Sequence, residues 1–332
     1  MGWGLRIAAG ALAAAAILAA ALFWAGLRIS APGPLRETAT VVVPRGSGLE
    51  AIALTLGEAG VVESPLLFMA GAQLTGAVRD LKAGEYAFAP GVSIDGVLKQ
   101  LRQGRTVVRR LTVPEGLTVA QVAALLDAEP ALSGEIRSRP PEGSLLPETY
   151  HFSYGDSRGA LVGRMKAAME MALAEAWRGR DPDLPFESPE QAVTLASIVE
   201  KETSVPEERA RVAGVFINRL KGGMRLQSDP TVIYALTDGA GELGRPLTRA
   251  DWKFESDYNT YHADGLPPGP IANPGRAALD AVLKPERHDF LYFVADGSGG
   301  HAFARTLAEH NRNVARWRAV QRRQSDGEPV GE

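Results

Sequence analysis

Leu195-Ala-Ser-Ile-Val-Glu-Lys-Glu-Thr203 is the stretch on which the interpretation of this chain depends. It closes a segment, residues 190–203, whose apolar and small residues predict a helix that is largely free of charge. Two acids, Glu200 and Glu202, lie near its end. Residues two apart are separated by about 200° around a helix axis, so their side chains should face different ways. We expect only one of the two carboxyl groups to point into a cleft.

The residues before Glu200 suggest which acid matters. A carboxyl group donates a proton near neutral pH only where its surroundings disfavour ionisation, chiefly by burial among apolar atoms. Ala196, Ile198 and Val199 would provide such surroundings for Glu200. A glutamate on a helix is more often a surface residue, so this pattern alone does not establish catalysis.

The composition excludes several kinds of chemistry. The chain has 332 residues, enough for two domains beyond an anchor. Its formal net charge of -3 lacks the basic bias of a nucleic-acid binder. It contains no cysteine, which removes disulfides, thiol nucleophiles and cysteine-based zinc sites. Its five histidines are scattered and form no HExxH pair, so we expect neither a metal nor another cofactor.

The N-terminal segment is predicted to cross a membrane. Residues 7–27 carry no charge, and a helix needs about 20 apolar residues to span the hydrocarbon core. The alternative is a cleaved signal peptide, because the segment is rich in alanine, but the apolar run exceeds the usual length of a signal-peptide core. We therefore favour a retained single-pass anchor in the cytoplasmic (inner) membrane. Residues 1–6 would be a cytoplasmic tail, and the bulk of the chain would lie on the outer, periplasmic or extracellular, side.

A first globular region, residues 40–142, is expected after a linker. The Pro- and Gly-bearing residues 28–39 should lift this region off the membrane. Strand signals at residues 40–43 and 84–88 enclose helical patterns at 49–59 and 64–75, and another helix is predicted at 93–103.

An internal echo lies within this region. Val43-Pro-Arg-Gly46 recurs as Val113-Pro-Glu-Gly116, and each is followed by a helical pattern. Thr118 is a plausible N-cap of the second helix. We interpret the echo as two similar strand–turn–helix units that share a sheet rather than as two binding sites.

A second region is predicted for residues 143–320. Helical patterns cover residues 161–177, 190–203, 207–221 and 306–320, and residues 291–304 have the pattern of a β-hairpin. Residues 321–332 are polar and are predicted to be disordered. The fold class is therefore α+β.

Several uninterrupted blocks, in one order, resemble the endolytic murein transglycosylases, the MltG or YceG-like family. Besides the opening stretch, these blocks are Val215-Phe-Ile-Asn-Arg-Leu220, Leu226-Gln-Ser-Asp-Pro-Thr-Val-Ile-Tyr234, Tyr258-Asn-Thr-Tyr261, Gly265-Leu-Pro-Pro-Gly-Pro-Ile-Ala-Asn-Pro-Gly275, Leu291-Tyr-Phe-Val-Ala-Asp296 and Gly300-His-Ala-Phe303. The resemblance covers roughly residues 40–318. It implies a LysM-like βααβ module within residues 40–142 and a catalytic domain over residues 143–320.

The resemblance also implies a reaction. Such an enzyme would be a carbon–oxygen lyase that cuts the MurNAc–GlcNAc bond within nascent glycan strands of peptidoglycan and leaves a 1,6-anhydro-MurNAc end. By its matching position, Glu200 would be the general acid and then the general base. One acid suffices, because the attacking group is the C6 hydroxyl of the same sugar rather than water. Glu202 and Asn218 would support the site from behind, and peptidoglycan synthases (penicillin-binding proteins) would be partners.

Further candidates for substrate contact come from the same blocks. Gln227 has an amide that suits an N-acetyl or hydroxyl group. Ser228 and Asp229 are also candidates, but one of them is expected to cap the helix before Pro230. Asp229 could also be a second catalytic carboxylate, and the reaction would then be a hydrolysis. The remaining candidates, each with a structural alternative, are Tyr258, Asn259, Tyr261, Asn273 and His301.

Two rival functions remain open at this stage. A membrane-tethered scaffold that binds peptidoglycan without cleaving it would suit the N-terminal half, although it would not need polar groups beside Glu200. A muramidase-type hydrolase on the same substrate would differ only in its product. No Ser/His/Asp spacing or cysteine indicates a protease.

Overall fold

The computed structural model describes residues 2–325, which divide into two compact units. Unit 1 holds the chain up to Arg110 together with Ala131–Ser133 and His151–Asp156. Unit 2 holds Leu111–Pro130, Gly134–Tyr150 and the chain from Ser157 onward. The sequence grouped residues 111–142 with the first region, but the structure places most of them in unit 2.

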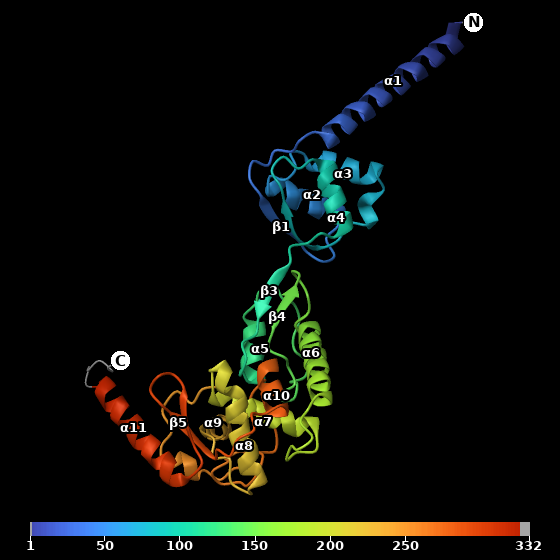
Figure 1. Cartoon of the computed structure of the whole chain (residues 1–332). Coiled ribbons are helices and arrows are strands. Elements are labelled where there is room, and N and C mark those ends of the chain that lie inside the picture. Colours follow the sequence, from blue (N-terminus) through green and yellow to red (C-terminus); the bar gives the residue numbers. More distant parts are fainter. Residues whose placement is uncertain (1, 326–332) are drawn as a thin grey trace. The chain divides into compact units, whose positions relative to one another are not determined.

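Helices and three two-stranded sheets make up the described part of the chain (Figure 1), which confirms the predicted α+β class. The first elements are α1 (Gly2–Ser30), β1 (Ala39–Val43), α2 (Leu49–Glu58), α3 (Pro65–Leu74), η1 (Ala77–Arg79), β2 (Gly84–Phe88) and α4 (Ile94–Gln103). Next come β3 (Arg109–Thr112), α5 (Val119–Asp127), β4 (Thr149–Phe152) and α6 (Arg158–Arg178). The remainder comprises α7 (Pro189–Glu202), η2 (Pro206–Glu208), α8 (Arg209–Lys221), α9 (Asp229–Thr237), η3 (Asp251–Lys253), α10 (Arg276–Leu283), β5 (Tyr292–Ala295), β6 (His301–Ala304) and α11 (Leu307–Ser325).

Unit 1 has the predicted strand–helix–helix–strand order. β1 pairs antiparallel with β2, with Ala39 opposite Phe88 and Val43 opposite Gly84. Alternation along a strand sends Val41 and Val43 into the core, where they pack with residues of α2, α3 and α4. The echoed turns both adopt the left-handed conformation that glycine allows, at Gly46 and Gly116, and a helix follows each. They do not share a sheet, however, because β1 pairs with β2 whereas β3 pairs with β4.

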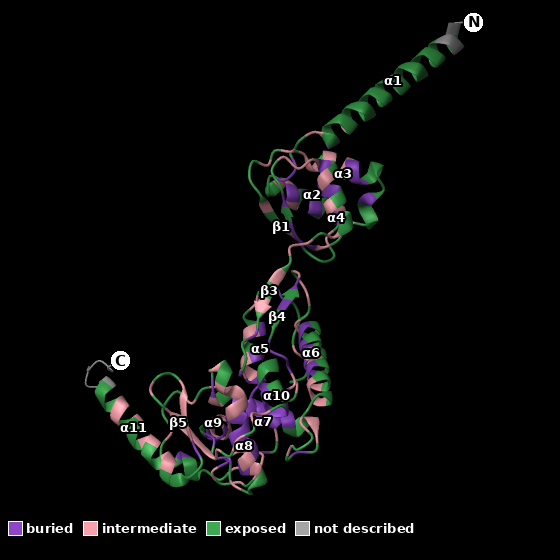
Figure 2. Cartoon of the chain, viewed as in Figure 1, coloured by how far each residue is buried: buried purple, intermediate pink, exposed green. Residues whose placement is uncertain are grey.

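α1 is long and apolar enough to cross a membrane. Within Arg6–Ser30, the most apolar window of 18 residues has a mean hydropathy of 2.2 and is 0% buried (Figure 2). This is consistent with the predicted single-pass anchor. The segment predicted as a linker, residues 28–39, begins within unit 1, because Ile29 packs into the core of that unit. Gly33 then donates its N–H to Gly91, and any Cβ on it would overlap Val92. The glycine that indicated flexibility instead permits close packing.

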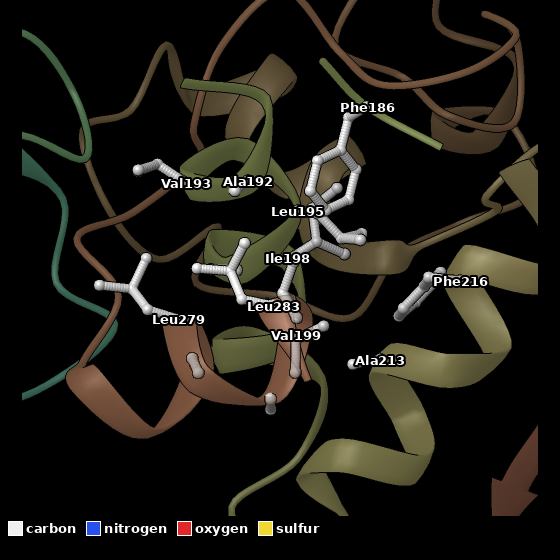
Figure 3. Close-up of a cluster of buried hydrophobic side chains, with 14 of the residues drawn as sticks. Phe186, Ala192, Val193, Leu195, Ile198, Val199, Ala213, Phe216, Leu279 and Leu283 are labelled. Atoms are coloured by element: carbon white, nitrogen blue, oxygen red, sulfur yellow. The ribbon is translucent and has the colours of Figure 1, made fainter. Parts of the chain in front are cut away.

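α7 is the central helix of unit 2. All of its residues from Ala192 to Val199 are buried. They pack against α6, α8 and α10, and Figure 3 shows Leu195 and Ile198 among side chains such as Phe216 and Leu283. Because a helix that is apolar on every side is stable only when it is covered on every side, α7 is fixed along most of its length. Its first turn, with Glu190 and Gln191, is exposed, and its last turn, with Glu200 and Glu202, reaches polar surroundings inside unit 2.

The ends of other elements also match local signals. Thr118 caps α5 as predicted, in a reciprocal capping box with Gln121. β5 and β6 form the predicted antiparallel hairpin. α11 extends to Ser325, so residues 321–325 are helical rather than disordered as predicted, and residues 326–332 lie outside the described part of the chain.

Candidate active site

The two acids of α7 face different partners, as predicted. A Glu200 carboxylate oxygen accepts a hydrogen bond of 2.8 Å from the backbone N–H of Gly275. Glu202 instead accepts a hydrogen bond from the hydroxyl of Ser228. The two carboxyl groups thus belong to separate clusters.

Glu200 is nearly buried beside one cation. Its side chain is 5% exposed, and Oε1 lies 3.6 Å from Nη2 of Arg209. Burial raises the pKa of Glu200, the N–H of Gly275 lowers it, and the nearby Glu115 carboxylate raises it again. The net direction is upward, with Arg209 and Lys201 opposing it. Glu200 is therefore closer than an ordinary glutamate to being a proton donor at neutral pH.

Gly275 is in contact with the carboxylates of both Glu200 and Glu115. It stands at the N-cap of α10, where the helix dipole favours negative charge. A Cβ at this position would overlap the Glu115 carboxylate, so a larger residue here would displace the Glu115 side chain. The contact with Gly275 favours the ionised form of Glu200, whereas burial favours the neutral form. A group that must give up a proton and later recover it needs both influences.

Arg209, the first residue of α8, lies between the two carboxylates. Its Nη2 atom is 3.6 Å from Glu200 and 4.0 Å from Glu115, and its side chain is 11% exposed. Its Nε atom is buried and has no hydrogen-bond partner among residues 2–325. A buried donor without a partner is costly, which is a feature of sites completed by a ligand or water.

The turn at residues 113–116 is held against the end of α7. Gly116 donates its N–H to the carbonyl of Asn273 at 3.0 Å, and its own carbonyl accepts a hydrogen bond of 3.3 Å from Lys201. A Cβ on Gly116 would lie 3.6 Å from Cγ of Glu200. The turn therefore covers the apolar part of the acid side chain and contributes to its burial.

A groove with a volume of about 490 Å³ adjoins this cluster within unit 2. Residues 115–118, Lys201, the α9 residues Pro230, Ile233 and Tyr234, and residues 241–245 line it, together with Gln121 and Ile271. Glu200 is not among the lining residues, but its neighbours Glu115 and Lys201 are. The groove has the size of a small-ligand site and mixes apolar walls with a few charged groups.

Glu202 forms the second cluster. Ser228 donates to it, and the backbone of Ser228 is fixed by Thr260, whose hydroxyl accepts the Ser228 N–H at 2.9 Å. Burial is the main cause that raises the pKa of Glu202, to about 7, with Asp229 adding to the rise and Ser228 opposing it. Glu202 is therefore also a candidate proton carrier, although its hydroxyl partner already occupies one oxygen.

Glu202 should make the stability of the protein depend on pH. Its pKa is about 7 in the folded state against 4.5 for an ordinary glutamate, so the folded protein holds this proton more tightly than the unfolded chain. The stabilising contribution is complete below about pH 4.5 and is lost as the pH rises to about 7. We expect Glu202→Gln to become more stable relative to wild type on going from pH 5 to pH 8, as measured by thermal unfolding.

The matched control for this measurement is Glu190→Gln, which changes an exposed acid in the first turn of the same helix. Its stability relative to wild type should not vary over this pH range. A Glu202→Gln difference that stays constant from pH 5 to pH 8 would show that Glu202 titrates normally.

The predicted helix cap at Ser228 or Asp229 is confirmed in position but not in its hydrogen bond. Ser228 occupies the N-cap of α9, but its side chain makes no capping bond, because its hydroxyl binds Glu202. Asp229 is the first residue of α9, and its Oδ1 accepts hydrogen bonds from the Tyr261 hydroxyl at 2.7 Å and from Trp252 Nε1 at 3.0 Å. Asp229 thereby orients two aromatic rings whose centroids are 5.9 Å apart.

Gln227 is exposed and has an unusual backbone. Its φ of 51° lies in the left-handed region, which costs a residue with a side chain about 1 kcal/mol or more. Its N–H is fixed by the carbonyl of Thr260 at 3.1 Å. The side-chain amide makes no hydrogen bond with the described residues and is available to a ligand.

Two predicted contact residues are structural. Asn259 and Asn273 are both 0% exposed. Asn259 donates to the carbonyls of Trp252 and Phe254, whereas Asn273 binds Leu145 and Leu117. These positions argue against the predicted contact of either asparagine with sugar. Buried amides with every local partner filled stabilise loops instead.

The other candidates have mixed surroundings. Tyr258 is half-buried, with its ring 4.9 Å from that of Tyr234. Nδ1 of His301 lies 2.6 Å from Glu208, and its side chain is 16% exposed. Asn218 donates to the carbonyls of His288 and Phe290 and so joins α8 to the chain before β5. None of these three contacts Glu200.

Four residues near the site were not singled out from the sequence: Glu115, Lys201, Arg209 and Trp252. Glu115 stands in the echoed turn, where the first copy has Arg45, and this change of charge was the available signal. Arg209 had no local signal, because only folding brings it to Glu200. Among residues 2–325 there is no group of three or more His, Asp or Glu side chains suited to hold a metal ion.

Comparison with known proteins identifies the family of this chain. The model of the YceG-like family matches residues 41–316, which include both clusters and the groove. The chain belongs to the YceG-like family. The predicted resemblance is therefore confirmed.

Relatives in this family have a named activity. Proteins named endolytic murein transglycosylase are 31% identical in Bacillus subtilis and 32% identical in Streptococcus pneumoniae, over 83% and 84% of this chain. These alignments cover 84% of the Bacillus protein but only 58% of the Streptococcus protein. A crystal structure of a YceG-like protein from Listeria monocytogenes is 33% identical, with a TM-score of 0.51, over 83% of this chain and 99% of that chain.

Proposed function

We propose that this protein is a membrane-anchored peptidoglycan lytic transglycosylase that acts within glycan strands. The family and the name of its relatives support the enzyme class and the murein substrate. The observation that carries the mechanism is the Glu200 carboxyl, which is 5% exposed, has a raised pKa and lies beside a groove.

In the proposed reaction Glu200 acts twice. It first donates its proton to the bridging oxygen as the bond from C1 of MurNAc to the GlcNAc oxygen breaks, which leaves GlcNAc with a free hydroxyl. The Glu200 carboxylate then takes the proton of the C6 hydroxyl as its oxygen bonds to C1 of the same MurNAc. Glu200 ends protonated, no water is consumed, and the product carries a 1,6-anhydro ring.

Neighbouring charges suit this sequence of steps. The transition state of glycosidic cleavage carries positive charge on the sugar ring. The Glu115 carboxylate lines the groove and would stabilise that charge. Arg209 holds Glu115 and Glu200 at 4.0 and 3.6 Å, and would steady the ionised Glu200 between the two proton transfers.

Aromatic and amide groups would bind the strand. We assign Gln227, with its exposed amide, to an N-acetyl or hydroxyl group. Tyr261 and Trp252, oriented by Asp229, would stack on a pyranose ring, and Trp252 is 37% exposed. Tyr258 remains a candidate contact. Three residues would support the site without touching the substrate: Glu202, Ser228 and Asn218.

The remainder of the chain would deliver the site to its substrate. α1 would be the single-pass anchor in the cytoplasmic membrane, with both units on the outer side. Unit 1 has the βααβ order of a LysM-like module, which would bind glycan. Peptidoglycan synthases that produce nascent strands would be partners.

Product analysis tests this proposal. Glycan strands digested with the full-length protein should yield fragments whose MurNAc end lacks one water relative to a reducing end, as measured by mass spectrometry. Reducing MurNAc ends would instead identify a hydrolase, and Glu115 or Asp229 would then be the second carboxylate. Absence of any cleavage would favour a scaffold that only binds peptidoglycan.

A further inference from the structure

Unit 1 carries an exposed apolar stripe on α3. Leu66 and Leu74 are 73% and 60% exposed, and Ala70 lies between them at the same spacing of four residues. This spacing places the three side chains on one face of the helix. Val78 of η1 follows and is 42% exposed. Exposed apolar residues that line up in this way mark a surface that contacts another phase or molecule.

The position of α3 next to the end of α1 indicates that this surface contacts lipid. α3 contacts the end of α1, and a Cβ on Gly71 would lie 3.3 Å from Cδ1 of Ile29. Ile29 comes two residues after the uncharged span ends at Leu27. A span of about 20 residues fills the hydrocarbon core, and the headgroup layer on each side adds several ångströms. With α1 crossing the membrane as proposed above, helix α3 would lie at the level of the lipid headgroups.

A basic groove adjoins the stripe. It has a volume of about 840 Å³ and is lined by residues that follow Leu74 and Val78, namely Thr75 and Arg79, and by residues of α4. Four exposed basic side chains, Arg79, Lys82, Lys99 and Arg102, meet only two acids, Asp80 and Asp95.

Two positive charges remain in this groove after its two acids are counted. Arg102 pairs with Asp80 at 3.4 Å. Within the described part of the chain no acid forms an ion pair with Arg79, Lys82 or Lys99. Three such cations beside an apolar stripe match the chemistry of a phosphate-bearing lipid surface.

We propose that unit 1 docks on the outer surface of a bilayer that contains anionic phospholipid. Leu66, Leu74 and Val78 insert at the boundary between headgroups and acyl chains, and the basic groove binds the phosphate of a lipid headgroup. The proposal rests on α1 crossing the membrane, as proposed above. Docking fixes unit 1 against the membrane instead of leaving it tethered by one helix.

The absence of cysteine allows a direct test in the full-length protein. Single cysteines at Leu74→Cys, at Ile17→Cys in α1 and at exposed Ala87→Cys in β2 would carry an environment-sensitive fluorophore in lipid nanodiscs. Quenchers attached to the lipid acyl chains then report contact with lipid. With phosphatidylglycerol present, we expect quenching at residue 74 to exceed that at residue 87 by at least about twofold.

Charge variants test the groove. Arg79→Glu/Lys99→Glu should bring quenching at residue 74 down to the level at residue 87, as should nanodiscs made of phosphatidylcholine alone. Arg45→Glu, which changes an exposed arginine in the turn of unit 1, should leave it unchanged. Free inorganic phosphate should not reproduce the effect, because the apolar stripe requires a bilayer.

The outcomes separate this proposal from the anchor itself. If the label at residue 17 is quenched and the label at residue 74 stays in water, docking is refuted and the anchor stands. If neither label is quenched, the anchor fails, and docking fails with it. Protection of residue 74 by glycan strands but not by lipid would assign the surface to peptidoglycan and overturn the proposal.

Discussion

Replacing Glu200 with glutamine should reduce the rate of glycan cleavage by about 100- to 10,000-fold, the usual contribution of a general acid–base group. Glutamine preserves the size of the side chain and can still accept the N–H of Gly275, but it has no proton to donate. Release of soluble fragments from purified sacculi measures the rate. Circular dichroism should show an unchanged fold, because the substitution removes no apolar packing.

Glu202→Gln is the matched comparison, since it removes a second carboxyl from the same turn of α7. We expect this variant to keep most of the activity, because the Glu202 carboxyl is bound to Ser228 and faces away from Glu200. If Glu202→Gln were inactive and Glu200→Gln active, the proton donor would be Glu202. Full activity in both variants would exclude a catalytic role for this helix end.

The substitution Asn273→Ala should destabilise unit 2 by about 2–4 kcal/mol. The side chain of Asn273 accepts the N–H of Leu145 at 2.9 Å and donates to the carbonyl of Leu117 at 2.8 Å. Alanine leaves the buried N–H of Leu145 without its partner and removes one of the two donors to the Leu117 carbonyl, which keeps the backbone N–H of Asn273 at 2.8 Å. Urea unfolding followed by tryptophan fluorescence measures the loss, because Trp177 and Trp252 lie in unit 2.

An exposed asparagine provides the control for this experiment. Asn311→Ala on α11 should change the free energy of unfolding by no more than about 0.5 kcal/mol. If Asn273→Ala were as stable as Asn311→Ala but cleaved glycan poorly, Asn273 would be a substrate contact after all. The structural assignment of this residue would then be wrong.

Local patterns predicted most of the elements, whereas contacts between distant residues were not predictable. The strands and helices of unit 1 and the capping box at Thr118 depend on neighbouring residues, so periodicity and side-chain chemistry indicated them. Ser228 has the local pattern of a helix cap, but folding brings Glu202 to it from 26 residues away. The Ser228 hydroxyl therefore binds Glu202 and makes no capping bond to the backbone of α9.

The residues of the candidate site also differ in how far the sequence predicted them. Glu200 was predicted from its matching position in the family blocks, whereas the groups that cover it, the turn at Gly116 and Gly275, come from distant parts of the chain. Asn273 was assigned to substrate because its partner Leu145, 128 residues away, has no signature in the sequence. Arg209 and Glu115 were missed for the same reason, since only the fold places them around Glu200.

The run of eight buried residues in α7 has a consequence for how this enzyme can adapt. Amides in such a helix should exchange their hydrogens only when the whole of unit 2 opens, so the proposed proton donor is attached to one of the slowest-exchanging segments of the chain. Evolution can therefore retune specificity by changing the loops that border the acid, but it cannot relocate the acid without unfolding its support.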